Sequence, residues 1–150
     1  MDSCVNETQQ KFFRALIDRM NAPGQFSSDV NVRIEEVAVG YAHGVLDVQP
    51  LNLNLLGIVH GGCLATLADT VAGMGVSAAG HRIVTANYGL NFLRPADGKR
   101  IHCFARAEKM GRTLCVMHVD LYNDDDRERK IASGNFTFSV LGPLSLEDIT

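Results

Sequence analysis

The sequence predicts an α+β fold in which one curved antiparallel sheet wraps around a single long central helix. Residues 60–79 form a helix-length apolar stretch with one charged side chain, Asp69. Segments with the two-residue alternation of strands flank it, two before residue 50 and four after residue 80. A helix that is apolar nearly all round must be buried on most sides, and a curved sheet meets that requirement. The successive strands beyond residue 100 exclude repeated βαβ units.

The first expected element is a helix over residues 6–20, because its apolar residues follow one helical stripe: Phe12, Phe13, Leu16, Ile17 and Met20. Asn6 is placed to cap its start, and the turn-forming residues 21–24 (Asn-Ala-Pro-Gly) end it. The length of 150 residues is ordinary for one domain. We therefore expect a single domain over 1–150, with residues 1–29 as N-terminal helix and linker and 141–150 as a tail.

The strand pattern begins at Val30, and Ala42-His43-Gly44 is expected to form a turn into a second strand at 45–48. The central helix is expected to end at Gly80. Four strands follow, at 84–92, 101–108, 113–122 and 131–140, joined by turns at 94–98, 110–111 and 123–126. In the first of these, Val84, Ala86, Tyr88, Leu90 and Phe92 are expected on one face, opposite Thr85, Asn87 and Asn91. The aspartates 124–126 are expected at a solvated hairpin tip.

Composition and motifs exclude several classes of function. The net charge is −3, the pI is about 5.9 and the cations are scattered, which excludes the broad basic face of a nucleic-acid-binding protein. The cysteines stand singly, at Cys4, Cys63, Cys103 and Cys115, and the polar N-terminus does not fit a signal peptide, so we expect reduced thiols in a cytoplasmic protein. Asp69 argues against membrane insertion of residues 61–79. The histidines lack metal-ligand spacing, and no phosphate-binding loop or nucleophile elbow occurs, so we expect no metal and no cofactor.

The informative segment runs from Asn54 to Gly62 and is followed by Asp69. Two glycines at the start of a helix, Gly61 and Gly62, leave the first backbone N–H groups uncovered by side chains. Such donors at the positive helix end suit an oxygen that develops negative charge, for example an acyl carbonyl that becomes a tetrahedral oxyanion. A lone carboxylate on a buried helix is costly unless it is paired or functional. Asp69 is therefore a catalytic candidate, the alternative being a surface position or a buried partner.

The pattern N-x-x-G-x-x-H-G-G, with an acid nine residues after the histidine, resembles the hotdog-fold acyl-CoA thioesterases, and most closely the phenylacetic acid degradation type. The similarity continues through residues 84–85, 92–96 and 111–114, so it covers roughly residues 30–140. The resemblance implies that the acid, Asp69, is the nucleophile or the general base. It implies that the Gly61 N–H polarises the carbonyl and that Gly62 allows close approach.

The same resemblance implies further roles. Asn54 and His60 would shape the pocket and orient the thioester, and Thr85 would position the attacking water. Basic residues on later turns would meet the phosphates of CoA, here Arg94, Lys109 and Arg112. Each assignment has a structural alternative: His60 as a helix cap, the glycines as packing residues, Thr85 as an ordinary strand residue and the cations as solvated side chains.

The resemblance thus implies hydrolysis of an acyl-CoA thioester to a carboxylic acid and CoA, by direct attack of Asp69 or through an activated water. The alternatives are a non-catalytic acyl-CoA-binding module and a hydroxyacyl-thioester dehydratase. The Ile83–Leu93 segment is long and has apolar groups on both faces, so we expect it to pair with its own copy in a homodimer or a dimer of dimers. In the family, each site combines the acid of one chain with the glycine N–H of its neighbour. The sequence does not fix the acyl group.

Overall fold

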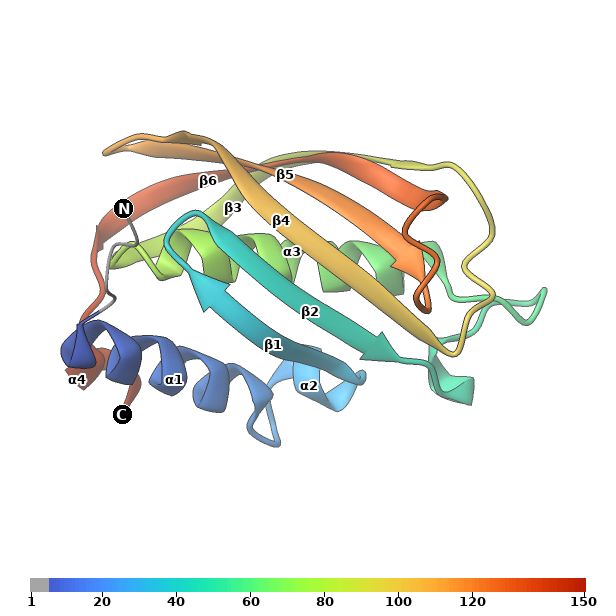
Figure 1. Cartoon of the computed structure of the whole chain (residues 1–150), viewed down its shortest axis with the longest axis horizontal. Helices are drawn as coiled ribbons and strands as arrows, with labels where there is room; N and C mark the ends of the chain where they lie inside the picture. Colours follow the sequence, from blue (N-terminus) through green and yellow to red (C-terminus); the bar gives the residue numbers. More distant parts are fainter. Residues whose placement is uncertain (1–5) are drawn as a thin grey trace.

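The computed structural model describes residues 6–150 and contains one six-stranded antiparallel sheet curved around a helix (Figure 1). The strand order is β1-β2-β4-β5-β6-β3. The bounds are β1 (Val32–Ala38), β2 (Tyr41–Asp47), β3 (His81–Phe92), β4 (Arg100–Met110), β5 (Leu114–Asn123) and β6 (Lys130–Pro143). The predicted α+β hotdog fold is confirmed. Cys4 lies outside the described residues, and the other three cysteines are free thiols.

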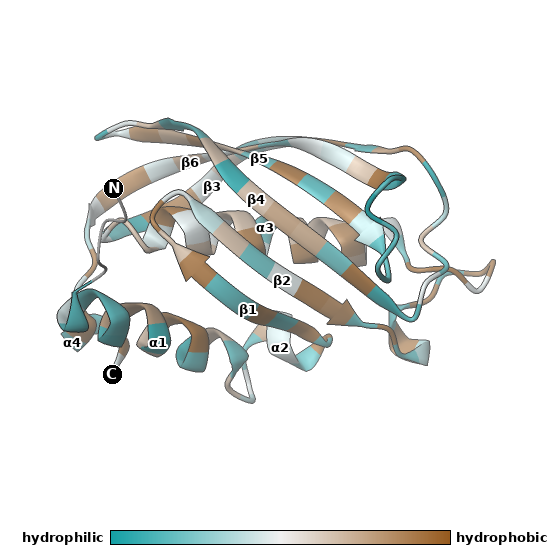
Figure 2. Ribbon diagram, viewed as in Figure 1, coloured by the Kyte–Doolittle hydropathy of each residue, from teal (hydrophilic) through white to brown (hydrophobic). Residues whose placement is uncertain are grey.

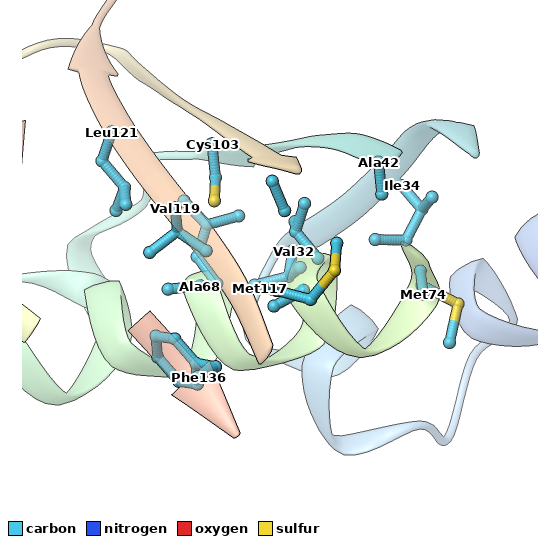
Figure 3. Packing of buried hydrophobic residues seen from close by; sticks show 14 of the residues in the cluster. Val32, Ile34, Ala42, Ala68, Met74, Cys103, Met117, Val119, Leu121 and Phe136 are labelled. Carbon is cyan, nitrogen blue, oxygen red and sulfur yellow. The ribbon is translucent and has the colours of Figure 1, made fainter. Parts of the chain in front are cut away.

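The central helix α3 (Gly61–Ser77) fills the concave side of the sheet, and most of its side chains are buried. Apolar residues from α3 and from the strands form one continuous core, as Figure 3 shows for Ala68, Met117 and Phe136. At Gly75 a Cβ would lie 2.6 Å from the Met117 side chain, so glycine there permits close packing of α3 against the sheet. Among residues 6–150, no helix is long and apolar enough to cross a membrane.

Helix α1 (Glu7–Asn21) closes one edge of the sheet. Its start is capped by Asn6, whose side chain accepts the Gln9 N–H at 2.8 Å, as predicted. At its end, the Asn21 side chain donates to the Ile34 carbonyl and accepts the Ile34 N–H, which satisfies the outer edge of β1. The short helix α2 (Phe26–Asp29) follows; the sequence analysis treated this segment as linker. A 3-10 turn (Pro50–Asn52) and α4 (Leu146–Ile149) complete the described elements.

Strand β3 forms the other edge, and none of the described residues pairs with its outer side. It is twelve residues long, and its apolar side chains Val84, Tyr88 and Phe92 are each about half exposed. It contains no proline or lysine, the residues that commonly protect edge strands from pairing. An open apolar edge of this length is suited to pairing with another strand.

The predicted turn at Ala42–Gly44 is wrong. The chain turns at Val39–Gly40, where Gly40 has φ +73° and donates its N–H to the Gly75 carbonyl. Gly44 lies inside β2, where a Cβ would come within 2.5 Å of the Val71 side chain. The sequence analysis took Gly44 as a turn signal, whereas the glycine is needed for packing against α3.

The predicted faces of β3 are also partly wrong. Its pairing with β6 shifts register between Thr85 and Asn87, which marks a β-bulge. The inward-facing positions therefore change from odd-numbered to even-numbered residues at the bulge. Before the bulge, Thr85 contacts α3, and after it, Tyr88 stacks on the buried Phe136. Figure 2 shows the alternating hydrophilic and hydrophobic bands along the strands on which such predictions depend.

Candidate active site

Asp69 and Thr85 meet at the boundary between α3 and β3. The Thr85 hydroxyl donates a hydrogen bond to Asp69 Oδ1 at 2.7 Å. Burial raises the pKa of Asp69 above its ordinary value, and the Thr85 hydrogen bond opposes that shift. The side chain is only half-buried, so a ligand can reach it. A carboxylate of this kind is a stronger base than a solvated aspartate and can accept a proton from water or attack an electrophile.

The backbone N–H groups at the start of α3 differ in their hydrogen bonding. His60 is the N-cap, and its Nδ1 accepts the Gly62 N–H at 2.8 Å. Among the described residues, the Gly61 N–H donates no hydrogen bond. A Cβ at Gly61 would lie 3.4 Å from Phe92 Cζ, so this donor lies beside the end of β3. The helix start therefore offers one free donor at its positive end.

One chain does not combine these two groups. Gly61 and Asp69 are eight residues apart on α3, which corresponds to about 12 Å along the helix axis. The structure thus brings Asp69 together with Thr85, and Gly61 together with His60 and Gly62, at two separate places. A single carbonyl carbon cannot contact both the Asp69 carboxylate and the Gly61 N–H of the same chain.

Asn54 organises the loop before α3. Its side-chain Oδ1 accepts the Leu56 N–H at 2.8 Å and the Ile58 N–H at 3.4 Å, which fixes a tight turn. The turn carries Leu55 and Leu56, whose side chains are almost fully exposed. Orientation of a thioester by Asn54 stays a prediction, as does any direct role of His60 beyond the cap.

The three predicted phosphate-binding cations lie at opposite ends of the sheet. Arg94 follows β3 and donates to the Lys130 carbonyl at 2.7 Å, near the start of α3. Lys109 and Arg112 are exposed around the turn that joins β4 to β5. The eleven residues of β4 separate the two places by roughly 35 Å. Within one chain, Arg94 therefore does not lie with the other two.

A groove that the sequence did not predict begins at Asp69 and Thr85. It encloses about 400 Å³, and one wall comes from α1 and α2, including Met20 and Phe26. The one available signal was Phe26, a large apolar residue in an otherwise polar segment. A four-residue helix has no periodicity from which this wall could be predicted.

The sequence profile of the thioesterase superfamily matches residues 56–130, which are half of the chain. The chain belongs to the thioesterase superfamily. The match includes Gly61, Asp69 and Thr85 and excludes Asn54, α1 and α2.

Several proteins similar to this thioesterase-superfamily chain are named acyl-CoA thioesterases, and two of them illustrate the extent of the similarity. Mouse acyl-coenzyme A thioesterase 13 is 33% identical over 95 residues, which cover 61% of this chain and 67% of that protein. The medium/long-chain acyl-CoA thioesterase YigI of Salmonella typhimurium is 25% identical over 133 residues, which cover 77% of this chain and 84% of that protein.

A solved structure gives a similar result. The hypothetical thioesterase of Streptococcus pneumoniae TIGR4, in a crystal structure with coenzyme A, has a TM-score of 0.69 and 33% identity, and the match covers 77% of this chain and 89% of that one. Variants of the same Streptococcus protein, in which a threonine or an aspartate is replaced by alanine, have also been solved.

Proposed function

We propose that this protein hydrolyses acyl-CoA thioesters at sites shared between two protomers. The observation that carries the proposal is the Thr85–Asp69 hydrogen bond: it holds a half-buried carboxylate of raised pKa at the mouth of a groove. Asp69 and Thr85 of one protomer supply the base and the hydroxyl. Gly61 of the second protomer supplies the N–H that polarises the carbonyl.

In the general-base form of the reaction, Asp69 removes a proton from a water held by Thr85 while the water oxygen attacks the thioester carbon. The carbonyl electron pair moves to oxygen, and the oxyanion accepts a hydrogen bond from the Gly61 N–H. When the carbonyl reforms, the C–S bond breaks and the CoA sulfur leaves as a thiolate that takes up a proton. In the alternative form, Asp69 attacks directly and water hydrolyses the resulting anhydride.

The contacts between α3 and β3 favour a shared site. Thr85 lies against Asp69, while Phe92 lies against Gly61, so the helix and the strand run in opposite directions. The midpoint between residues 85 and 92 falls at Tyr88–Gly89. A two-fold axis near this point would pair two β3 strands into one continuous sheet. It would also bring the Phe92 end of one protomer, with its Gly61, to the Thr85 end of the other.

The same two-fold axis would place Arg94 of one protomer near Lys109 and Arg112 of the other. Leu114, which starts β5, pairs with Ser139, and Ser139 pairs with Val84, so the β4–β5 turn lies at the Thr85 end of the sheet. Arg94 lies at the Phe92 end. Pairing about Tyr88–Gly89 would therefore bring Arg94 of one protomer toward Lys109 and Arg112 of the other. A cationic surface beside a thioester site suits the phosphates of CoA.

The comparisons support this proposal. The similar Streptococcus structure contains coenzyme A, and its two alanine variants replace an aspartate and a threonine that are sixteen residues apart. Asp69 and Thr85 have the same separation. Membership of the phenylacetic acid degradation type, assembly into dimers of dimers and a cytoplasmic location remain our predictions for this chain.

A dehydratase is less compatible with the geometry. That reaction would need an imidazole nitrogen that is free to accept a proton from the substrate, whereas Nδ1 of His60 already accepts the Gly62 N–H as the cap of α3. A measurement of CoA thiol release distinguishes hydrolysis from the alternative of a non-catalytic acyl-CoA-binding module. We expect the wild-type protein to release CoA thiol from acyl-CoAs, and Asp69→Asn to bind the same acyl-CoAs with little release. Tight acyl-CoA binding by wild type without thiol release would contradict the proposed hydrolysis.

A further inference from the structure

The groove beside Asp69 and Thr85 runs along α3 toward the C-terminal end of that helix. Its volume of about 400 Å³ lies within the usual range of small-molecule sites. Most of the large side chains in its walls are apolar (Met20, Phe26, Met74, Ile83 and Phe138), and the remaining large one, Gln25, is uncharged. Asp69 is the sole ionisable side chain among the described residues that line it. Walls of this chemistry suit an uncharged hydrocarbon group and offer no counter-charge to a charged one.

The floor of the groove is open because residue 73 is glycine. A Cβ at Gly73 would meet Ile83 Cδ1 and Phe138 Cε1 at 3.6 Å, an ordinary contact distance. Packing therefore does not require glycine at this position, unlike at Gly75. Glycine inside a helix is less stable than alanine, so Gly73 weakens α3 without a packing gain. The space it leaves is part of the groove.

The outer wall is a fixed structure built by α1 and α2, which lie outside the family match. The Ser27 hydroxyl donates to Met20 Sδ at 3.2 Å, and the Ser28 hydroxyl donates to the Ala22 carbonyl at 2.6 Å. These bonds hold the short helix against the end of α1. Phe26 is 73% exposed at the rim of the groove, an arrangement in which an apolar ligand would cover the ring.

We propose that this groove binds a straight aliphatic acyl chain, and that Gly73 and Phe26 set the length that is preferred. The inference rests on the proposed function, because Asp69 and Thr85 fix where the thioester carbonyl lies. From Asp69 to Ser77 the helix rises about 12 Å. An extended chain advances about 1.2 Å per bond, so acyl groups of about eight to ten carbons fill this length. A phenylacetyl group fills only part of it.

The test is a chain-length series. kcat/KM is measured for acetyl-, butanoyl-, hexanoyl-, octanoyl-, decanoyl- and phenylacetyl-CoA. Each methylene buried in the groove should raise kcat/KM about three- to fourfold, up to about ten carbons. Gly73 lies one helical turn, about 6 Å, beyond Asp69, so the Gly73→Leu side chain should obstruct octanoyl much more than butanoyl. We expect the octanoyl-to-butanoyl ratio of kcat/KM to fall about tenfold or more in that variant.

A second variant keeps the test valid if Gly73→Leu does not fold. Phe26→Ala removes an exposed ring and should lower the octanoyl-to-butanoyl ratio severalfold. Val39→Ala shortens another exposed apolar residue, at the β1–β2 turn and outside the groove, and should leave the ratio unchanged. A wild-type preference for acetyl- or phenylacetyl-CoA, or an unchanged ratio in Phe26→Ala, would overturn the inference.

Binding separates this inference from the proposed hydrolysis. S-decyl-CoA and S-butyl-CoA are thioethers that cannot be hydrolysed, and their Kd values can be measured by calorimetry on the wild-type protein. Tighter binding of S-decyl-CoA, weakened by Phe26→Ala, supports the groove even if no acyl-CoA is hydrolysed. Equal Kd values for the two thioethers would overturn the groove assignment even if hydrolysis is observed.

Discussion

Replacing Gly61 by proline removes the backbone N–H that is proposed to donate a hydrogen bond to the thioester carbonyl oxygen. Gly61 is the first residue of α3, the position where proline is best tolerated in a helix. The preceding residue, His60, has φ −60° and ψ 136°, which is compatible with a following proline. The Gly61 N–H donates no hydrogen bond among the described residues, so its loss should cost little stability. Gly61→Pro therefore deletes the donor with little expected effect on the fold.

Gly61→Ala is the matched control. Alanine and proline both add a Cβ about where Phe92 Cζ lies 3.4 Å away, but alanine keeps the N–H. Loss of one donor to an oxyanion lowers kcat about 10²–10³-fold, equivalent to ~2.7–4 kcal/mol of transition-state stabilisation. We expect a loss of this size in Gly61→Pro and a much smaller one in Gly61→Ala.

The assay is CoA thiol release at saturating acyl-CoA, with circular dichroism melting and sedimentation to verify fold and assembly. KM is measured for both variants, because the proline ring adds two atoms that alanine lacks. If a folded, dimeric Gly61→Pro protein turns over as fast as Gly61→Ala, the Gly61 N–H does not polarise the carbonyl and the assignment is refuted.

Three further predictions concern the acid, the hydroxyl and the β3 edge. Asp69→Asn should lower kcat about 10²-fold or more. It should also raise the melting temperature at neutral pH. Because burial raises the pKa of Asp69 in the folded state, the ionised side chain destabilises the folded protein at pH values above its ordinary pKa, and asparagine removes that penalty. A lower melting temperature in Asp69→Asn would point to a structural role instead. Thr85→Ala should lower kcat with little change in KM, and it should shift the acidic limb of the pH–kcat/KM profile to higher pH because the hydrogen bond that lowers the Asp69 pKa is lost. Thr85→Ser keeps the hydroxyl and should restore both kcat and the pH profile. A rise in KM alone would make Thr85 a binding residue. Val84→Lys adds a cation to the exposed β3 edge, opposite Leu93 and next to Arg94 of the second protomer in the proposed pairing. It should shift sedimentation toward monomer with loss of activity, whereas Val84→Thr should not. A fully active monomer would exclude the shared site.

Local sequence patterns predict the order of the main helices and strands in this fold. The apolar stretch around Asp69 allows only a buried helix, and alternation placed the last four strands close to their observed bounds. Asn6 was assigned correctly to a helix cap, because such positions have strong residue preferences. Gly80 was expected to end the central helix; α3 ends at Ser77, and Gly80 follows it in a left-handed conformation with φ +83°. These features depend on neighbouring residues, which the sequence displays directly.

The features that were missed depend on tertiary contacts. Alternation appeared continuous along β3, yet the bulge at residues 85–87 decides that Thr85 faces Asp69. Gly44 carries the composition of a turn, but the Val71 side chain requires a glycine inside the strand. Arg94 and Arg112 lie in the connecting segments as expected, whereas Lys109 lies inside β4. The distance between Arg94 and Lys109 follows from strand length and pairing. Sequence patterns therefore predicted the candidate residues, and the structure shows which of them lie close together.

Mixing two inactive variants tests whether each active site is shared between two chains. Asp69→Asn and Gly61→Pro proteins are unfolded together, refolded as an equimolar mixture, and verified to form mixed dimers by tagging one chain. In a mixed dimer, one site combines Asp69 and Thr85 of the Gly61→Pro chain with the intact Gly61 of the Asp69→Asn chain. Random pairing makes half of the dimers mixed, each with one of two sites intact, so shared sites should restore about a quarter of wild-type thiol release. No gain over the separate variants, in verified mixed dimers, would contradict the shared site.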